Sequence, residues 1–208
     1  MTHARSRLAT LIYDEREPLI QYWIATLLAI GPIWRTQVIK GNNETFANTD
    51  ILDYLDLNTE AVRSQPTPPA DLDRYLEGAD LTALFRQNRL YDALARLCQT
   101  LALNECERRL LTLTWHINSH SLLNQCMDGV SSIGRNSLFN LLAVMSGQGR
   151  EPIARALNAG ATLPACGLVT VSPNERFLNL ADMVRMDYQM SALLEDICFG
   201  QSERLDCL

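Results

Sequence analysis

Two histidines four positions apart, His116 and His120, are the residue pair with the clearest capacity for chemistry in this sequence. They lie on or just beyond a predicted helix, where this spacing can direct two imidazoles to one metal ion, and Cys126 could add a third ligand. A zinc protease also needs a glutamate directly after the first histidine, but Ile117 stands there. The alternative is that both histidines meet the negative end of the helix dipole, and we predict no metal site.

The sequence contains no complete loop for nucleotide binding. A phosphate-binding loop carries Gly-Lys followed by Ser or Thr, whereas the single lysine, Lys40, is followed by Gly41 and has no glycine before it. The segment 147–149, Gly-Gln-Gly, offers half of a dinucleotide fingerprint, but Pro152 occupies the place of the third glycine. No Gly-x-Ser-x-Gly elbow is present. We therefore predict that the chain is not an enzyme and binds no cofactor.

Composition limits the class of protein and its partners. The 208 residues are 47% hydrophobic and have a net charge of −6, from eighteen basic and twenty-four acidic side chains. A chain of this length and composition can bury a substantial core. Its negative net charge disfavours DNA binding, because DNA-binding domains usually carry a positive net charge that neutralises phosphates. The six cysteines lie far apart, without a Cys-x-x-Cys pair or a recognisable leader segment. We interpret them as reduced core thiols in a cytoplasmic protein.

The amino-terminal half predicts one buried helix and a domain boundary. Apolar residues recur at helical spacing over about 15–30 and stop at Gly31-Pro32, a stretch too short and too polar to span a membrane. Residues 44–80 then carry nine carboxylates against two arginines, a local charge of −7. Three prolines within 66–69 favour extended backbone. We therefore divide the chain into an N-terminal helical region (1–63), a proline-rich linker (64–73) and a helical domain (74–208).

The helical domain begins with a leucine-rich run and a capped helix. Leu90, Leu94, Leu97 and Leu101 lie on one face of a helical run. The pattern that follows, Asn-Glu-Cys-Glu at 104–107, resembles a capping box and predicts a helix that starts at residue 105. Further helices are predicted over about 121–129, 137–146 and 151–158, the second of them ending near Gly147.

The last elements of the helical domain are predicted to form a β-hairpin. Two apolar runs, 168–171 and 176–180, flank the turn cluster Ser-Pro-Asn-Glu. Helices followed by a two-stranded ribbon are the order of a winged-helix unit. The sequence thus predicts a mainly α fold: a helical bundle with a C-terminal winged-helix-like unit, three helices plus a β-hairpin, at about 104–182. The alternative is a two-stranded flap without a role.

Three stretches carry a resemblance to a known family. NRLYDALARLCQTLALNECERRLLTLTWHINSHSLL places a leucine helix before a capped L-x-L-x-x-x-E-x-x-L-L helix, and IARALNAGATLPACGLVTVSPNERFLNLADMV continues through L-x-x-x-G-L-V-x-V. With EREPLIQYWIATLLAI, they resemble the region that precedes the ATPase module in a group of bacterial AAA+ ATPases. The resemblance implies a ring-forming AAA+ motor module in cis that would bind ATP and Mg. This chain lacks that module, so it is either a fragment or a stand-alone relative, and no catalytic residue carries over.

The resemblance favours recruitment over chemistry. We predict a non-catalytic recognition and regulatory N-terminal domain that recruits a protein partner or substrate to the motor. Its predicted contact residues lie around the third helix and the hairpin: Arg150, Arg155, Arg176 and Phe177. The alternative is a winged-helix DNA-binding module, but residues 100–208 carry eight arginines against eleven carboxylates, so nucleic acid is not the favoured partner. Because the motor forms the ring in this family, we expect a monomer or weak dimer.

Overall fold

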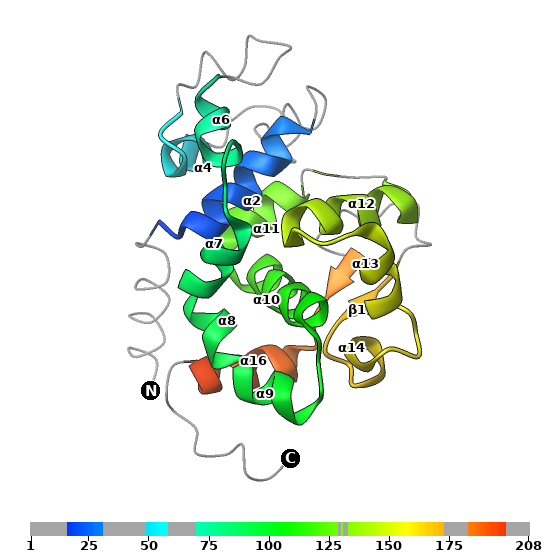
Figure 1. Cartoon of the computed structure of the whole chain (residues 1–208). Coiled ribbons are helices and arrows are strands. Elements are labelled where there is room, and N and C mark those ends of the chain that lie inside the picture. The colour runs from blue at the N-terminus through cyan, green and yellow to red at the C-terminus, as the bar shows by residue number, and fades with distance from the viewer. Residues whose placement is uncertain are drawn as a thin grey trace.

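The structure is a computed structural model that describes residues 16–30, 49–57, 70–128, 130, 133–172 and 183–198. In these ranges the chain is mainly helical, as predicted, with one small sheet of two strands. Figure 1 shows α10 (Glu105–Ser119) near the centre of the molecule, whereas α4 and α6 lie at one end of it, beside α2. None of the described helices is long and apolar enough to cross a membrane.

The elements follow one another in this order. Before α10 come α2 (Pro18–Ala29), α4 (Thr49–Tyr54), α6 (Ala70–Leu76), α7 (Leu81–Gln87), α8 (Arg89–Ala93) and α9 (Ala95–Thr100). After it come α11 (Ser121–Asp128), α12 (Arg135–Ser146), α13 (Arg150–Ala156), α14 (Thr162–Ala165), β1 (Thr170–Val171), β2 (Val184–Arg185) and α16 (Tyr188–Cys198).

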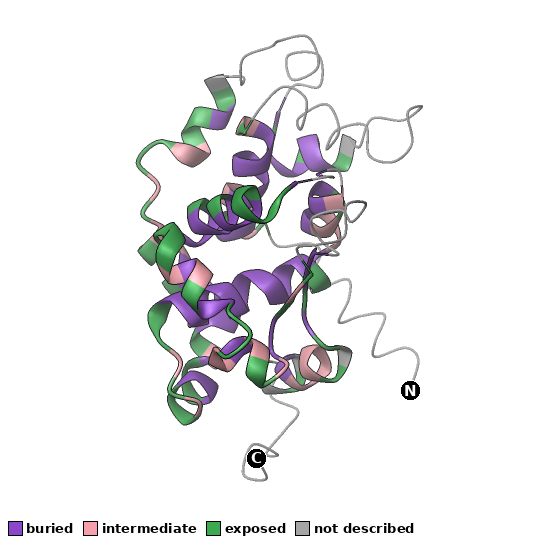
Figure 2. Ribbon diagram, turned by 90° about the vertical axis from the view of Figure 1, so that its right-hand side faces the viewer, coloured by how far each residue is buried: buried purple, intermediate pink, exposed green. Residues whose placement is uncertain are grey.

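Helix α10 starts where the sequence predicts and forms the centre of the core. The Asn104 side chain accepts a hydrogen bond from the Glu107 amide (3.1 Å), and the Glu107 carboxylate accepts one from the Asn104 amide (2.9 Å), which completes the capping box. Residues 109–117 are all buried, because α8, α11, α12, α13, α16 and β2 contact the helix. Figure 2 shows this concentration of buried residues in the middle of the molecule.

Helix α2 belongs to the same core, although the acidic region separates it from α10 in the sequence. It confirms the predicted amino-terminal helix. Its fully buried Trp23 donates the indole N–H to the carbonyl oxygen of Met145 in α12 (2.7 Å), and the helix also packs against α6, α7 and α11. The described residues on both sides of the predicted linker therefore share one hydrophobic core. Residues 70–73 of that linker belong to α6, whereas 58–69 are not among the described residues.

The predicted helical run before residue 101 is divided into three short helices. Asn88 separates α7 from α8, because its backbone is extended (φ −80°, ψ 122°) and its side chain accepts a hydrogen bond from the Tyr91 amide as the N-cap of α8. Leu94 separates α8 from α9. The predicted leucine residues nevertheless face the core, since Leu90, Leu94 and Leu97 are all buried.

The helices predicted over 121–129, 137–146 and 151–158 are confirmed as α11, α12 and α13. Gly147 ends α12 with φ 63°, in the left-handed region that glycine adopts without strain. The amide of Gln148 bonds to the Ala143 carbonyl and that of Gly147 to the Val144 carbonyl, which is a Schellman motif. The turn at 147–149 is therefore short, and α13 folds back against both α12 and α10.

The β-ribbon pairs differently from the prediction. The predicted partner of 168–171 was 176–180, but β1 is antiparallel to β2, with Thr170 opposite Arg185 and Val171 opposite Val184. The segment 176–180 falls outside the described residues. Local turn chemistry favoured the nearest apolar run, whereas the structure buries the later segment, in which Met183 and Val184 are fully enclosed.

The cysteines follow the prediction of core thiols only in part. Cys98, Cys106 and Cys126 are free and buried, and burial raises the pKa of each thiol, to about 11 for Cys98 and Cys106. Cys166 is free but exposed, because it follows the short helix α14 at the surface. The buried thiols are therefore protonated at neutral pH and contribute as small apolar side chains.

Candidate functional site

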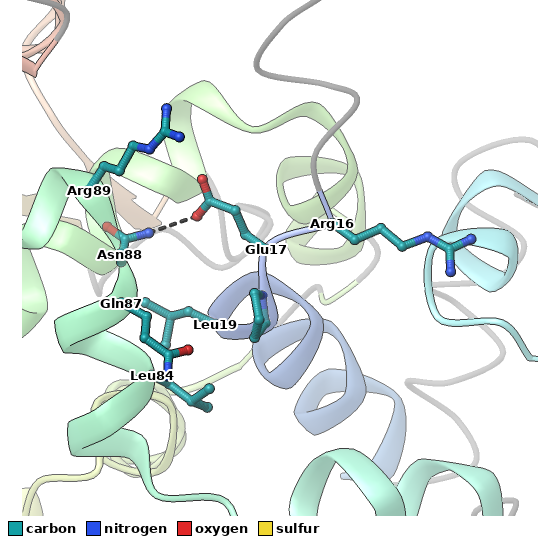
Figure 3. Close-up of a pocket in the computed structure, with 8 residues that line it drawn as sticks. Arg16, Glu17, Leu19, Leu84, Gln87, Asn88 and Arg89 are labelled. Atoms are coloured by element: carbon teal, nitrogen blue, oxygen red, sulfur yellow. Dashed lines mark hydrogen bonds between the residues drawn. The ribbon is translucent and has the colours of Figure 1, made fainter.

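A cleft of about 230 Å³ opens where the start of α2 meets the junction of α7 and α8. The residues that line it are Arg16, Glu17, Pro18, Leu19, Leu84, Gln87, Asn88 and Arg89. Figure 3 shows the Glu17 carboxylate directed toward Asn88, while Arg16 extends away toward α4. There the Arg16 guanidinium pairs with the Asp56 carboxylate at 2.6 Å. The sequence analysis did not identify this cleft, because its walls come from segments about seventy residues apart.

Asn88 connects the cleft to the core. Its side-chain nitrogen lies 2.7 Å from Glu17 Oε2 and 3.0 Å from His116 Nε2, and its side-chain oxygen accepts the Tyr91 amide hydrogen at 3.1 Å. An amide NH₂ group only donates, so Nε2 of His116 accepts and the imidazole proton is assigned to Nδ1. Asn88 is only 4% exposed. One buried amide thus joins α2, α8 and α10.

The two histidines singled out in the sequence are core residues. Burial lowers the pKa of His116 to about 3, with nearby His120 adding to the shift, and burial lowers the pKa of His120 to about 4. The rings of Trp23 and Trp115 pack against His116, and that of Tyr54 packs against His120. Both imidazoles are therefore neutral at physiological pH, so they do not act as cations at the end of the helix dipole. The described part of the chain contains no group of three metal-ligating side chains.

Arg109 is a buried cation that holds three segments together. Its guanidinium donates to Glu105 Oε1 (2.7 Å), to the Ser146 carbonyl (3.1 Å) and to Thr82 Oγ1 (3.0 Å). It also lies 4.9 Å from the centre of the Phe85 ring. These contacts join α7, α10 and the end of α12, so the Arg109 charge stabilises the fold and is not presented to a ligand.

Only two of the four predicted contact residues fall in the described part, and they do not form one patch. Arg150 and Arg155 are exposed near opposite ends of α13, and they lie five positions, or about 7.5 Å along the helix axis, apart. Arg150 Nη2 donates to Asn136 Oδ1 at 2.6 Å, which directs its side chain toward the start of α12. Arg155 instead lies near Cys106, where it opposes the rise that burial gives the pKa of that thiol. Arg176 and Phe177 are not among the described residues.

A face that the sequence analysis missed extends from Arg150 along α12. Arg135 is the first residue of α12 and packs over the Phe139 ring at 5.2 Å from its centre. The exposed positions 136, 140 and 144 recur every four residues, and Val144 is 53% exposed. We define the arginine face as Arg150, the stripe of Asn136, Asn140 and Val144, and Arg135 at the start of the helix, which lies half a turn around the helix axis from Val144. The predicted helix start at 137 left Arg135 outside the helix, although Gly134 directly before it is a plausible N-cap.

The charge of this region differs in sign from that of the chain. Residues 135–156 contain three arginines and one carboxylate, Glu151, a net charge of +2 in a chain with a net charge of −6. In the part of the chain that the structure describes, these observations define a mainly helical fold with one small antiparallel sheet and an exposed, arginine-bearing pair of helices. No family model, curated protein sequence or solved structure matches the chain.

Proposed function

We propose that this chain is a non-catalytic recognition and regulatory domain that recruits a protein partner or substrate. The observation that carries the proposal is the arginine face, a positive and partly apolar surface on an otherwise acidic chain. Protein-binding surfaces are enriched in arginine and centre on side chains that a partner can cover. The face is also held rigidly, because Arg109 and Trp23 fix the end of α12 through the carbonyls of Ser146 and Met145.

We further propose that the unit around this face is winged-helix-like. Helices α10, α12 and α13 contact one another pairwise, and the ribbon follows them in the sequence with β2 against α10. The turn between α12 and α13 has the three-residue length typical of helix-turn-helix pairs. The resemblance to the region before AAA+ motors supports a role in bringing the partner to such a motor in cis, where ATP and Mg would bind.

A DNA-binding module is the second candidate, because the same pair of helices could enter a groove. Its recognition helix would be α13, which begins Arg150-Glu151. The Glu151 carboxylate stands in the first turn, where it would face the phosphates and weaken their binding. A protein partner therefore fits the charges of this surface better than a duplex.

The test compares two pairs of charge reversals on the purified chain. Arg135→Glu with Arg150→Glu alters the arginine face, whereas Arg86→Glu with Arg96→Glu changes the same number of exposed charges on α7 and α9. Each protein is used as bait in an extract of the cells that produce it. We expect the wild type and the α7/α9 variant to retain a common partner that the face variant loses. Equal retention by all three would refute the surface, and a salt-dependent duplex shift lost in the face variant would support the DNA candidate instead.

A further inference from the structure

We propose that Asn88 is a proton-sensitive gate in the wall of the cleft, closed while the His116 imidazole is neutral and opened when that ring takes up a proton. Asn88 lines the cleft, and its side-chain nitrogen also lies 3.0 Å from His116 Nε2. Asn88 and His116 are each 4% exposed. At this point a single carboxamide therefore stands between the cleft and a titratable group of the core (Figure 3).

The proton and the closed position of Asn88 exclude each other. While His116 is neutral, its Nε2 accepts a hydrogen bond from Asn88 Nδ2, and Nε2 is also the ring nitrogen that takes up the next proton. A protonated Nε2 is a donor, so two donors would face each other at 3.0 Å. The carboxamide can restore this contact only by turning over, so that its oxygen accepts from Nε2, or else it must leave the imidazole.

Either movement breaks two further contacts of the gate. Asn88 Oδ1 accepts the Tyr91 amide hydrogen at 3.1 Å, which caps α8, and Nδ2 donates to Glu17 Oε2 at 2.7 Å, which ties α8 to the start of α2. A turned carboxamide would place its oxygen beside the Glu17 carboxylate and its NH₂ group beside the Tyr91 amide. Both contacts would then pair like with like and be lost. Acid should therefore release the N-cap of α8 and the connection to α2 together.

The charged and titratable groups that the structure describes around the gate come from the start of α2, from α4 and α8, and from the end of α10. They are Arg16, Glu17, Tyr54, Arg89 and His120. Burial lowers the pKa of His116, and of these groups only His120 adds to that shift. Burial also raises the pKa of Tyr54 to about 12, so neither it nor the arginines change charge in mild acid. Glu17 contacts the gate directly, so its titration has to be separated from that of His116.

The size of the effect follows from the two environments of His116. Behind the closed gate its pKa is about 3, whereas an imidazole that meets water has a pKa near 6.5. Below pH 6.5 the open state therefore binds about one proton more than the closed state, and the closed state loses stability as the pH falls. The equilibrium constant for opening should increase about thirty-fold between pH 7.5 and 5.0. Global unfolding exposes His120 as well, so it should take up about two protons.

Amide hydrogen exchange, followed by NMR on the whole chain, can measure this opening at Tyr91, because its amide loses its acceptor when the gate opens. The capping box of α10 supplies a matched control. The Glu107 amide also donates to an asparagine oxygen at 3.1 Å, but that asparagine, Asn104, bonds to Glu107 and not to a histidine. Exchange rates at pH 7.5 and 5.0 are corrected for intrinsic exchange and extrapolated to zero urea, since an opening that urea does not promote is local.

The variants separate the imidazole from the carboxylate. We expect the opening at Tyr91 to increase about thirty-fold from pH 7.5 to 5.0 in the wild type and in Glu17→Gln, while the opening at Glu107 changes little by comparison. His116→Gln offers Asn88 an acceptor oxygen but no titratable ring, so it should abolish the response to pH. Circular dichroism verifies that each variant is folded. If His116→Gln does not fold, the comparison of the two amides in the wild type still decides.

Three outcomes would overturn the gate. Equal responses of the Tyr91 and Glu107 amides to pH would show a general loss of stability in acid. A response at Tyr91 that persists in His116→Gln would remove the imidazole from the mechanism. A response that disappears in Glu17→Gln would assign the effect to protonation of the carboxylate instead.

Discussion

Acidification from pH 7.5 to 5.0 should remove about 4 kcal/mol from the free energy of unfolding, through His116 and His120. Both have folded pKa values, about 3 and about 4, below their ordinary value of 6.5. The unfolded chain therefore binds more protons below pH 6.5, and stability falls with pH until the folded protein also takes up protons. At pH 5.0 each histidine contributes about 1.5 pH units at 1.36 kcal/mol per unit, or about 2 kcal/mol.

This loss can be measured by urea unfolding at several pH values between 7.5 and 5.0, followed by circular dichroism and tryptophan fluorescence. His3→Gln is introduced in every protein, so that only the buried pair of histidines titrates. Carboxylates with ordinary pKa values stay ionised in both states over most of this range and contribute little. The slope of the free energy of unfolding against pH should correspond to an uptake of about two protons per molecule on unfolding below pH 6. The His120→Gln variant should take up about one. Stability that stays constant between pH 7.5 and 5.0 would refute the burial of neutral imidazoles.

The remaining predictions concern stability and use the same urea assay. Asn104→Ala removes the N-cap of the capping box and should cost about 1 kcal/mol, whereas Asn104→Ser should restore most of it. Gly147→Ala should cost about 1–3 kcal/mol, because φ is positive there and the added Cβ would lie 2.7 Å from a leucine methyl group. Gly160→Ala, where φ is not positive and the added Cβ meets no atom within 4 Å, should be nearly neutral. Arg109→Met should cost about 2 kcal/mol, less than a fully buried ion pair, because Glu105 is 49% exposed.

Structural features that depend only on a few adjacent residues were predicted correctly. The capping box at 104–107 and the left-handed Gly147 are local, since each depends on backbone groups within one turn of helix. The amino-terminal helix was equally clear, because its apolar spacing requires burial whatever the partner is. For such features the nearest residues determine the conformation, and tertiary packing only has to be compatible with it.

Features that depend on distant partners could not be predicted. The second strand was placed at 176–180 because a turn cluster points to the nearest apolar run. The structure instead pairs Val171 with Val184, a buried residue further along the chain, and no local pattern indicates that pairing. Arg135 was missed because its role depends on Arg150 reaching across from α13 to Asn136. Helix boundaries also shift by one or two residues, and here such a shift removed Arg135 from the predicted helix.

Asn88 is the clearest example of a residue whose contacts could not be predicted from the sequence. In the sequence it is one polar residue in a helical run, with nothing to indicate that it ends α7, caps α8 and bonds to both Glu17 and His116. A buried amide must satisfy its donors and acceptor, and only the fold brings together partners that are 71 and 28 residues away.

The same non-local connection bears on the arginine face. Helix α2 is held to α8 through Glu17 and Asn88, and to α12 through the Trp23–Met145 hydrogen bond. Without α2, the Met145 carbonyl would lose its partner and the buried side of α12 would lose the fully enclosed Trp23 ring. The surface that we assign to recognition therefore depends on a helix more than a hundred residues earlier. We therefore expect residues 74–208 without α2 to be less stable than the whole chain, and a fragment prepared for the binding test should include α2.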